Sequence, residues 1–317
     1  MDDSHGRVIR ARTSFYDVQL GDSVLRCTLR GRVKRERRSE EGKQIYADPV
    51  AVGDEVVVAP LDEERGVIEG ILPRRTKLSR RHPGKRDTIE QIVVANADQV
   101  VAVVSTRLPD LNYRTLDRFL ILAEAGQMEA VVCLNKMDLI DSVEKGRVTS
   151  MLNVYERLGY RVIYTSVTDG AGIDRLQSVL SEKFSVIVGA SGVGKSSLLN
   201  AVQPGLALPI GEVGLKTGKG RHTTTLVELF SLENGGEVAD TPGIREVGLW
   251  GVDTEDLDLY FPEMDSYLGE CKYNDCIHLN EPDCAVTEAV NAGEISPVRY
   301  RSYVVLKTGS SVGIAAP

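Results

Sequence analysis

The sequence predicts three folded units: an N-terminal OB-like β-barrel, a central α/β domain around a buried sheet, and a small, mostly helical C-terminal unit. Three observations lead to this prediction. Short strands with alternating apolar residues and Gly or Asp turn signals occupy residues 6–72. Continuously apolar runs separated by helical patterns follow from about residue 96. After about residue 247 the chain becomes irregular and polar, and its cysteines cluster there.

Composition and charge narrow the class of protein. A chain of 317 residues with 42% hydrophobic and 26% charged residues is typical of a globular protein of two or three domains. It contains no apolar run of membrane-spanning length and no leader pattern, so we expect a cytoplasmic protein without a membrane partner. The net charge is −8, but residues 1–90 hold 19 Lys and Arg against 16 Asp and Glu. We therefore expect any polyanionic partner to meet the N-terminal part.

The barrel prediction depends on five runs, at residues 6–11, 15–20, 23–29, 53–60 and 66–72. Between two of them lies RGRVKRERRSEEGK (30–43), which we interpret as a polar loop, and PRRTKLSRRHPGKRD (73–87) is interpreted as a linker. Basic runs are usually solvated loops. On an OB-like barrel, whose loops commonly grip nucleic acid, RNA binding is the better interpretation. Few aromatic residues are available for stacking, which favours recognition of folded RNA through its phosphates and shape.

The central domain is predicted from buried strands that alternate with helices. The strands are DQVVAVVST (98–106), AVVCL (130–134), YRVIYTS (160–166) and FSVIVG (184–189), and helical patterns cover 113–126 and 173–184. TLVELFSL (225–232) and GEVAD (236–240) are predicted to form a hairpin joined to the same sheet. Further helices are expected within 285–306.

A phosphate-binding loop is predicted where GASGVGKS (189–196) follows a strand and opens a helix. Its glycines let backbone N–H groups turn toward phosphate oxygens, and the helix N-terminus adds the positive end of its dipole. The lysine would reach the terminal phosphates and the first serine after it would ligate Mg²⁺. The candidate residues are Gly189, Ala190, Ser191, Gly192, Val193, Gly194, Lys195, Ser196 and Ser197. This loop does not by itself choose between ATP and GTP.

The choice of base is predicted from NKMD (135–138), which follows the strand AVVCL. The carboxylate of Asp138 can accept from both N1–H and the exocyclic amine of guanine, a donor pair that adenine lacks. Asn135, Lys136 and Met137 would support this loop and the base plane. In TSV (165–167), Ser166 or the neighbouring backbone would meet the guanine carbonyl. Alone this tetrapeptide is a weak signal, but beside a phosphate loop we favour a guanine site.

Two further segments have the character of nucleotide-dependent switches. In DTPG (240–243), Asp240 suits support of Mg²⁺ and the N–H of Gly243 suits a γ-phosphate. In GRHTTT (220–225), either Thr223 or Thr224 would complete the Mg²⁺ shell. The residue after DTPG is Ile244, which cannot orient a water molecule as a glutamine would. Our hypothesis is that His222 orients the attacking water, the alternative being a solvated loop histidine.

The order of these motifs along the chain is itself informative. NKMD and TSV precede the phosphate loop, whereas most GTP-binding chains have the reverse order. Moving the first two segments to the end restores the usual order, so we predict a circular permutation. Loops at the carboxyl ends of parallel strands meet in one pocket whatever their connections. The helix within 173–184 would be the new connection.

The cysteines predict a structural metal site. Cys271, Cys276, His278 and Cys284 offer three thiolates and one imidazole, a closed tetrahedral set for one Zn²⁺ ion. The alternative is three reduced cysteines buried as small hydrophobic residues. Clustering in a polar segment with little core of its own favours the metal. Cys27 and Cys133 lie in predicted strands and are expected in the core.

With these motifs in place, the chain resembles the circularly permuted bacterial GTPases of small ribosomal subunit biogenesis, the RsgA or YjeQ family. The resemblance covers nearly the whole chain, including the barrel strands, ANADQV (95–100), the permuted motifs, GRHTTT and the cysteine cluster. It implies a slow GTPase, stimulated by the small subunit, that acts in its late maturation, with His222 as the catalytic histidine. Gly192 stands where some related GTPases carry a potassium-binding Asn, so the sequence does not predict potassium dependence.

The complete prediction is a barrel (1–75), a permuted P-loop GTPase domain (76–247), a zinc-binding domain (248–308) and a disordered tail (309–317). Expected partners are the small ribosomal subunit with its rRNA, and GTP or GDP with Mg²⁺; the chain is expected to be a monomer. The competing function is an RNA-binding assembly or checkpoint factor for which nucleotide is mainly a conformational ligand.

Overall fold

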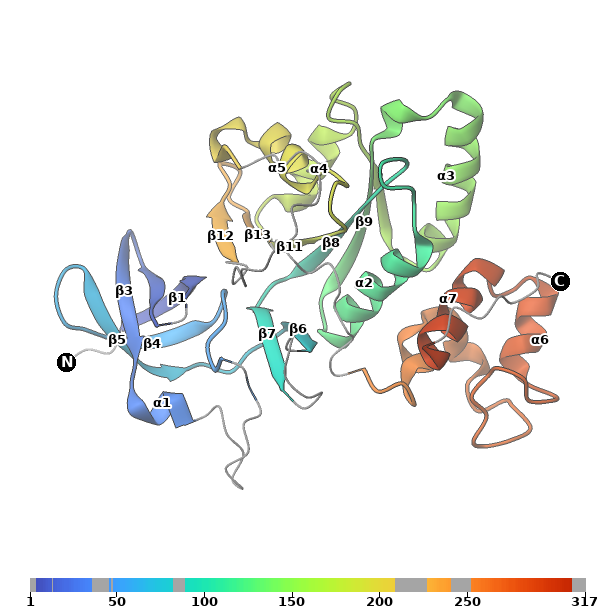
Figure 1. Cartoon of the computed structure of the whole chain (residues 1–317), viewed down its shortest axis with the longest axis horizontal. Coiled ribbons are helices and arrows are strands. Elements are labelled where there is room, and N and C mark those ends of the chain that lie inside the picture. Colours follow the sequence, from blue (N-terminus) through green and yellow to red (C-terminus); the bar gives the residue numbers. More distant parts are fainter. Residues whose placement is uncertain are drawn as a thin grey trace, which may run out of the picture.

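The computed structural model describes residues 4–12, 14–35, 46, 48–81, 89–208, 227–240 and 252–309 (Figure 1). Its N-terminal part is a barrel of five strands in the order β1-β2-β3-β5-β4, closed by pairing of β4 with β1. Alternate side chains such as Val8, Val18, Val56 and Ile68 are fully buried inside it. The predicted barrel is confirmed, with strands β1 (Ser4–Ala11), β2 (Tyr16–Leu20), β3 (Ser23–Leu29), β4 (Glu55–Pro60) and β5 (Arg65–Ile71).

Two segments predicted as irregular chain contain regular structure. Within residues 30–43, α1 (Gly31–Arg35) is a short helix because Val33 is fully buried against the barrel core. Within residues 73–87, β6 (Lys77–Arg81) pairs antiparallel with β7 (Glu90–Ala95). The predictions of a loop and a linker were wrong at these places, because one buried apolar residue among many charges leaves no periodic signal. Residues 36–45 and 82–88 lie outside the described part of the chain.

The central sheet contains six strands in the order β10-β9-β8-β11-β13-β12. All neighbours are parallel except β12 and β13, which form the predicted antiparallel hairpin. The three strands that precede β11 in the chain lie on one side of it, and the two that follow lie on the other. The strands are β8 (Gln99–Ser105), β9 (Glu129–Asn135), β10 (Arg161–Tyr164), β11 (Phe184–Val188), β12 (Glu228–Ser231) and β13 (Glu237–Asp240).

Helices cover both faces of this sheet (Figure 1). On one face α2 (Tyr113–Ala125) and α3 (Ser142–Arg157) pack over side chains such as Ala102 and Val104. On the other face α4 (Ile173–Leu180) and α5 (Lys195–Val202) pack over Val101 and Val103. Successive residues of one strand therefore enter different cores, which explains why β8 is apolar along almost its whole length. The doubly wound prediction is confirmed, and α4 provides the expected connection from β10 at the edge to β11 in the centre.

The C-terminal unit lies beside α2 rather than against the sheet (Figure 1). It consists of η3 (Leu257–Tyr260), η4 (Pro262–Tyr267), α6 (Ala285–Ala292) and α7 (Pro297–Thr308). Its core includes Phe261, Met264 and Tyr303, and Ile121 of α2 is part of the same cluster. The helices expected within 285–306 are therefore present, and the predicted tail falls largely in residues 310–317, outside the described part. Among the helices that the structure describes, none has the length and apolar character needed to cross a membrane.

Candidate nucleotide site and metal centre

The phosphate loop connects the fully buried strand β11 to the N-terminus of α5. Close approach of other backbone requires glycine at its start, because a Cβ at Gly189 would lie 2.4 Å from the carbonyl oxygen of Val103. Lys195 Nζ donates to the carbonyl oxygens of Gly189 at 2.8 Å and Ala190 at 3.0 Å. The lysine therefore extends back across its own loop, and its ammonium lies beside the peptides that such loops use to surround phosphate oxygens.

A hydrogen bond joins the early tetrapeptide to this loop. Asn135, at the end of β9, donates from Nδ2 to the carbonyl oxygen of Val193 at 2.9 Å, although 58 positions separate the two residues. Thr165 Oγ1 donates to Asn135 Oδ1 at 3.1 Å, which fixes the orientation of the amide. Since a buried amide with both ends satisfied has one position, Asn135 holds three loops together. The structure thus brings the segments 135–138, 165–166 and 189–194 to one end of the sheet.

Asp138 is positioned by the loop after β10. Ser166 Oγ donates to Asp138 Oδ1 at 2.8 Å, and the backbone N–H of Met137 donates to the carbonyl oxygen of Thr165 at 3.1 Å. Desolvation alone would raise the pKa of the Asp138 carboxyl, but hydrogen bonds, led by that of Ser166, lower it overall from the ordinary value of 3.8. The group is therefore an ionised acceptor at neutral pH. The residue remains partly exposed.

The remaining predicted residues fall in two groups. Ser191 is exposed in the phosphate loop, and Ser196 and Ser197 are partly buried in the first turn of α5. Asp240 ends β13, paired in register with Ile187 of β11, so it lies beside the strand that enters the phosphate loop. Four predicted positions lie outside the described residues; they are His222, Thr223, Thr224 and Gly243.

Sequence reasoning did not single out Thr106, which follows β8. Its backbone N–H donates to the carbonyl oxygen of Asn135 at 3.1 Å and its Oγ1 donates to that of Lys136 at 2.6 Å. Lys136 has a φ of 62°, and its Nζ donates to the carbonyl oxygen of Leu108. The segment between β8 and α2 therefore supports the backbone of the tetrapeptide. The available signal was position alone, a hydroxyl residue directly after a buried strand.

The Cys and His side chains of the C-terminal unit form a compact cluster. The four ligand atoms of Cys271, Cys276, His278 and Cys284 all lie within 4.8 Å of one another. Cys271 Sγ and Cys284 Sγ are 3.9 Å apart, and each lies 3.5 Å from His278 Nδ1. A tetrahedral zinc ion with Zn–S of about 2.3 Å and Zn–N of about 2.0 Å requires S···S near 3.8 Å and S···N near 3.5 Å. The cluster therefore fits a metal ion of this size.

The surroundings of the cluster also suit a cation. Asp258 Oδ2 lies 3.8 Å from His278 Nε2, on the side of the ring opposite the ligand nitrogen, where metal-bound histidines commonly meet a carboxylate. The thiols differ in acidity: desolvation raises the pKa of Cys276 to about 12. At Cys284 hydrogen bonds, led by the backbone N–H of Thr287 in the first turn of α6, outweigh desolvation and lower the pKa, so Cys284 ionises more readily than Cys276. Cys27 and Cys133 are fully buried in strands, as predicted for core residues.

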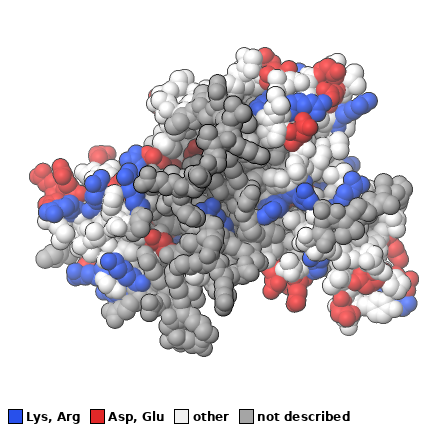
Figure 2. Space-filling view, viewed as in Figure 1, with Lys and Arg blue, Asp and Glu red and all other residues white. Residues whose placement is uncertain are grey.

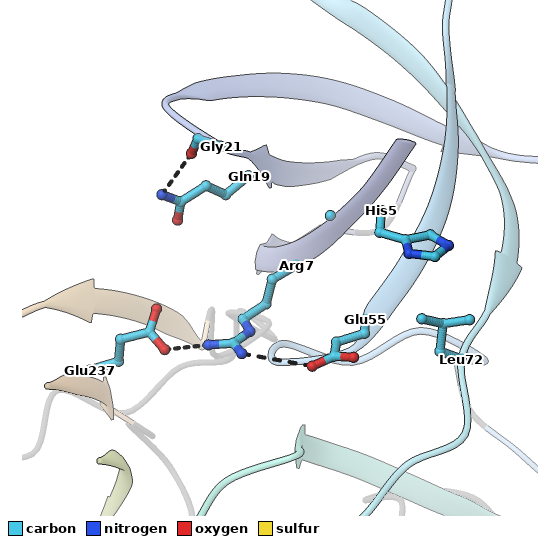
Figure 3. Close-up of a pocket in the computed structure, with 8 residues that line it drawn as sticks. His5, Arg7, Gln19, Gly21, Glu55, Leu72 and Glu237 are labelled. Atoms are coloured by element: carbon cyan, nitrogen blue, oxygen red, sulfur yellow. Dashed lines mark hydrogen bonds and ion pairs between the residues drawn. The ribbon is translucent and has the colours of Figure 1, made fainter. Parts of the chain in front are cut away.

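Two ion pairs connect the barrel to the central sheet. Arg7 of β1 pairs with Glu237 of β13, and Arg10 of β1 pairs with Glu228 of β12. Arg10 and Glu228 are also the residues at which β1 and β12 form their antiparallel bridge. Arg7 reaches across a hollow of about 360 Å³ whose other side carries Glu55 (Figure 3). The barrel is thus attached to both strands of the hairpin.

Fold and site together define a circularly permuted P-loop GTPase. A family profile described as RsgA GTPase matches residues 71–250, and one described as RsgA N-terminal domain matches residues 5–68. The chain belongs to the RsgA GTPase family.

Individual relatives agree over nearly the full length. The small ribosomal subunit biogenesis GTPase RsgA of Alkaliphilus metalliredigens is 39% identical over 95% of this chain and 96% of the relative. The protein of the same name from Gemmatimonas aurantiaca is 44% identical over 88% of each chain. Among solved structures, YjeQ from Thermotoga maritima matches with a TM-score of 0.76 at 34% identity, over 96% of this chain and 98% of that one. YloQ, described as a circularly permuted GTPase, matches with a TM-score of 0.71 at 32% identity, over 97% of this chain and 94% of that one.

Proposed function

We propose that this GTPase acts in maturation of the small ribosomal subunit, and that GTP hydrolysis times its release from that particle. The observation that carries the proposal is the hydrogen bond from Asn135 to Val193, which joins segment 135–138 to the loop 189–194 and supports a shared nucleotide site. The particle is proposed from the name of the relatives, small ribosomal subunit biogenesis GTPase. Its compartment would be the cytoplasm, where we expect a monomer acting on assembling subunits.

Within this site each loop has one task. Asp138 accepts from guanine, and Ser166 holds its carboxylate in place. The N–H groups of residues 189–194 and the N-terminus of α5 receive the phosphates, with Lys195 reaching the terminal ones. A Mg²⁺ ion, when bound, supplies positive charge to the β- and γ-phosphates. Ser196 and Asp240 offer the hard oxygen ligands it prefers and would hold it with Thr223 or Thr224.

Hydrolysis requires a water molecule oriented at the γ-phosphate, and we assign this task to His222. Ile244 follows the DTPG segment and has no group that can hydrogen-bond water. His222 adjoins the threonines proposed for magnesium, so a conformation that completes the ion's shell would also deliver the imidazole. The backbone N–H of Gly243 would donate a hydrogen bond to the γ-phosphate. Loss of this phosphate would therefore affect the segment that leads into the C-terminal unit.

RNA contact is proposed for the barrel. Figure 2 shows Lys and Arg side chains gathered at the barrel end of the molecule, with acidic groups beside them. Several arginines in this part of the chain are held by ion pairs: Arg74 is paired with the fully buried Asp54 at 2.6 Å, and Arg30 and Arg32 share Glu69 at 3.1 and 3.3 Å. Since such intramolecular pairs are partly neutralised, binding should use fewer phosphate contacts than the sequence count implies.

The attachment of the barrel offers a route from RNA to hydrolysis. The hairpin strands β12 and β13 adjoin segments 209–226 and 241–251, which contain the proposed switch residues. Arg10 pairs with Glu228 and Arg7 with Glu237, so displacement of the barrel by RNA would pull on both strands.

The C-terminal cluster is proposed to hold one structural zinc ion, because all four donors are protein groups and no position is left for water. We propose 1–75, 76–247 and 248–308 as the corresponding domains.

The competing function is an RNA-binding checkpoint factor in which nucleotide only orders the switches. Hydrolysis of GTP with and without purified small subunits separates the two. Strong stimulation by mature or nearly mature subunits, abolished by His222→Ala with GTP affinity unchanged, is the expected result. Two results together would contradict this function: subunits bind without changing the rate of GTP hydrolysis, and the His222→Ala variant dissociates from them as fast as the unmodified chain. Hydrolysis would then not time release. Binding measured from low to high salt tests the RNA contact in the same samples.

A further inference from the structure

Helix α2 is buried on two sides. Leu116, Phe119 and Leu120 face the central core, whereas Ile121 belongs to the core of the C-terminal unit. Asp117 lies among these apolar residues and is fully buried. Burying a carboxylate in such a position costs free energy unless it is paired. The partners of Asp117 therefore indicate which elements are positioned by contact with α2.

Those partners come from two other elements. Arg299 of α7, only 1% exposed, donates from Nη1 to Asp117 Oδ1 at 2.6 Å, and Tyr155 of α3 donates its hydroxyl to the same oxygen at 2.8 Å. The remaining nitrogens of Arg299 donate to Glu263 of η4, from Nε at 2.7 Å and from Nη2 at 3.0 Å. The guanidinium also lies over the ring of Phe261, 4.6 Å from its centre. One buried arginine thus joins the GTPase domain to the C-terminal unit.

The two charges of this junction shift each other's pKa. Desolvation raises the pKa of the Asp117 carboxyl overall, although Arg299 and the hydrogen bonds from Ser302 and Tyr155 act in the opposite direction. Desolvation acts to lower the pKa of Arg299, but Asp117 and Glu263 more than offset it and raise the pKa above its ordinary value. Apolar residues of similar volume often give equal stability at such places. The directed hydrogen bonds of the Arg299 guanidinium add a defined position of α7 on α2.

The N-terminus of α2 lies next to the base-reading loop. Asn112 caps the helix by accepting from the N–H of Thr115 at 3.0 Å. The segment before it begins with Thr106, whose two hydrogen bonds hold the backbone of Asn135 and Lys136. Asp117 is five residues beyond the cap, which corresponds to about 7.5 Å along a helix. A shift of α2 at Asp117 would reach the peptide that precedes Asp138 through residues 106–112 and the hydrogen bonds of Thr106.

The other end of the junction reaches the metal cluster. Tyr300 donates its hydroxyl to the carbonyl oxygen of His278 at 2.8 Å, and Tyr303 donates to that of Ile277 at 2.8 Å. Both tyrosines are on α7, within one turn of Arg299. The backbone that carries a metal ligand is thereby bonded to the helix that grips α2.

We propose that the Arg299–Asp117 junction couples guanine-nucleotide binding to the metal-bearing C-terminal unit, with both residues acting as positioning residues for the base-reading loop. This rests on the proposed guanine site. Coupling between two ligands is reciprocal, so bound nucleotide should also slow the loss of zinc. Energetic coupling of this kind typically changes affinity by fivefold or more.

Two isosteric or charge-preserving variants, Asp117→Asn and Arg299→Lys, test the proposal in the zinc-loaded full chain. Fluorescent GDP titration should give a Kd raised at least about fivefold, with kcat at saturating GTP within about twofold of the unmodified chain. Tyr160→Phe is the matched control. It removes a buried hydroxyl bonded at 3.1 Å to Glu124, near the other end of α2, and should leave the Kd unaltered. Equal weakening in all three variants would indicate general loss of packing and overturn the proposal.

A second measurement needs no variant. Transfer of zinc from the unmodified chain to a chromophoric chelator should be slowed several-fold by saturating GDP, and this effect should vanish in Asp117→Asn. Absence of the effect in the unmodified chain overturns the coupling. Because GDP titration of the unmodified chain is the first step, failure of the guanine site itself would appear there, before either variant is compared.

Discussion

Substitution of Asp138 by asparagine should convert the base preference from guanine to xanthine. In GTP the carboxylate would accept from N1–H and the exocyclic amine, and a hydrogen bond to a charged acceptor contributes about 1.5–3 kcal/mol. One carboxylate oxygen already accepts from Ser166 at 2.8 Å, and the group is partly exposed, so we use the lower value for each bond. Loss of both should cost about 3 kcal/mol, which corresponds to a GTP affinity roughly 150-fold weaker. Xanthine replaces the amine with a carbonyl that the Asn amide can donate to, so XTP should recover most of that loss.

The assay compares GTP, XTP and ATP hydrolysis and binding by the unmodified chain and by Asp138→Asn. Asp110→Asn is a suitable control, because this carboxylate is 78% exposed in the neighbouring segment between β8 and α2 and has no assigned contact with the base. The unmodified chain and the control should prefer GTP over XTP and ATP. Two results would contradict this assignment: Asp138→Asn keeps full GTP affinity, or its GTP affinity falls without a gain in XTP affinity. Asp138 would then not bind the base, and the nucleotide site shared by segments 135–138 and 189–196 would be assigned incorrectly.

Three further outcomes follow from the structure. Gly194→Ala should weaken GDP binding at least tenfold, because φ is 99° there and a Cβ would lie 2.4 Å from the side-chain nitrogen of Asn135; fluorescent GDP titration measures this. Gly205→Ala, where a Cβ meets nothing within 4 Å, should bind normally. Cys276→Ala should lower zinc from one to less than one equivalent per chain and melt the C-terminal unit at lower temperature, and an unchanged melt would contradict a structural metal. Burial raises the pKa of Cys133 to about 11, so at pH 8 about one thiol in a thousand is ionised and iodoacetamide should modify Cys133 only after denaturation. The thiolate fraction of Cys133 rises with pH and is still very low at pH 8. Appreciable labelling of Cys133 in the native chain at this pH, detected by mass spectrometry, would therefore show that the strand opens.

Much of this protein was determined by local sequence. Alternation in the first 72 residues predicted the barrel strands, because a half-buried strand has a period of two. Continuous apolar runs predicted the central strands, because each is covered by helices on both faces. The order of NKMD and GASGVGKS predicted the permutation, which the strand order and the comparisons bear out. The cysteine spacing predicted a metal cluster, and the four ligand atoms do converge.

Other features depended on contacts between residues distant in the chain. The sequence contained Asp117 within an apolar helix, but only packing against α7 identified Arg299, 182 positions away, as its partner. The basic segment 73–87 was interpreted as a linker that contributes to RNA binding, yet Arg74 is held by the buried Asp54, and part of the expected linker is strand β6. The physical reason is common to these cases. Periodicity and motif spacing report what a residue's own segment requires, whereas the pairing of a buried charge is set by whichever element the fold packs against it.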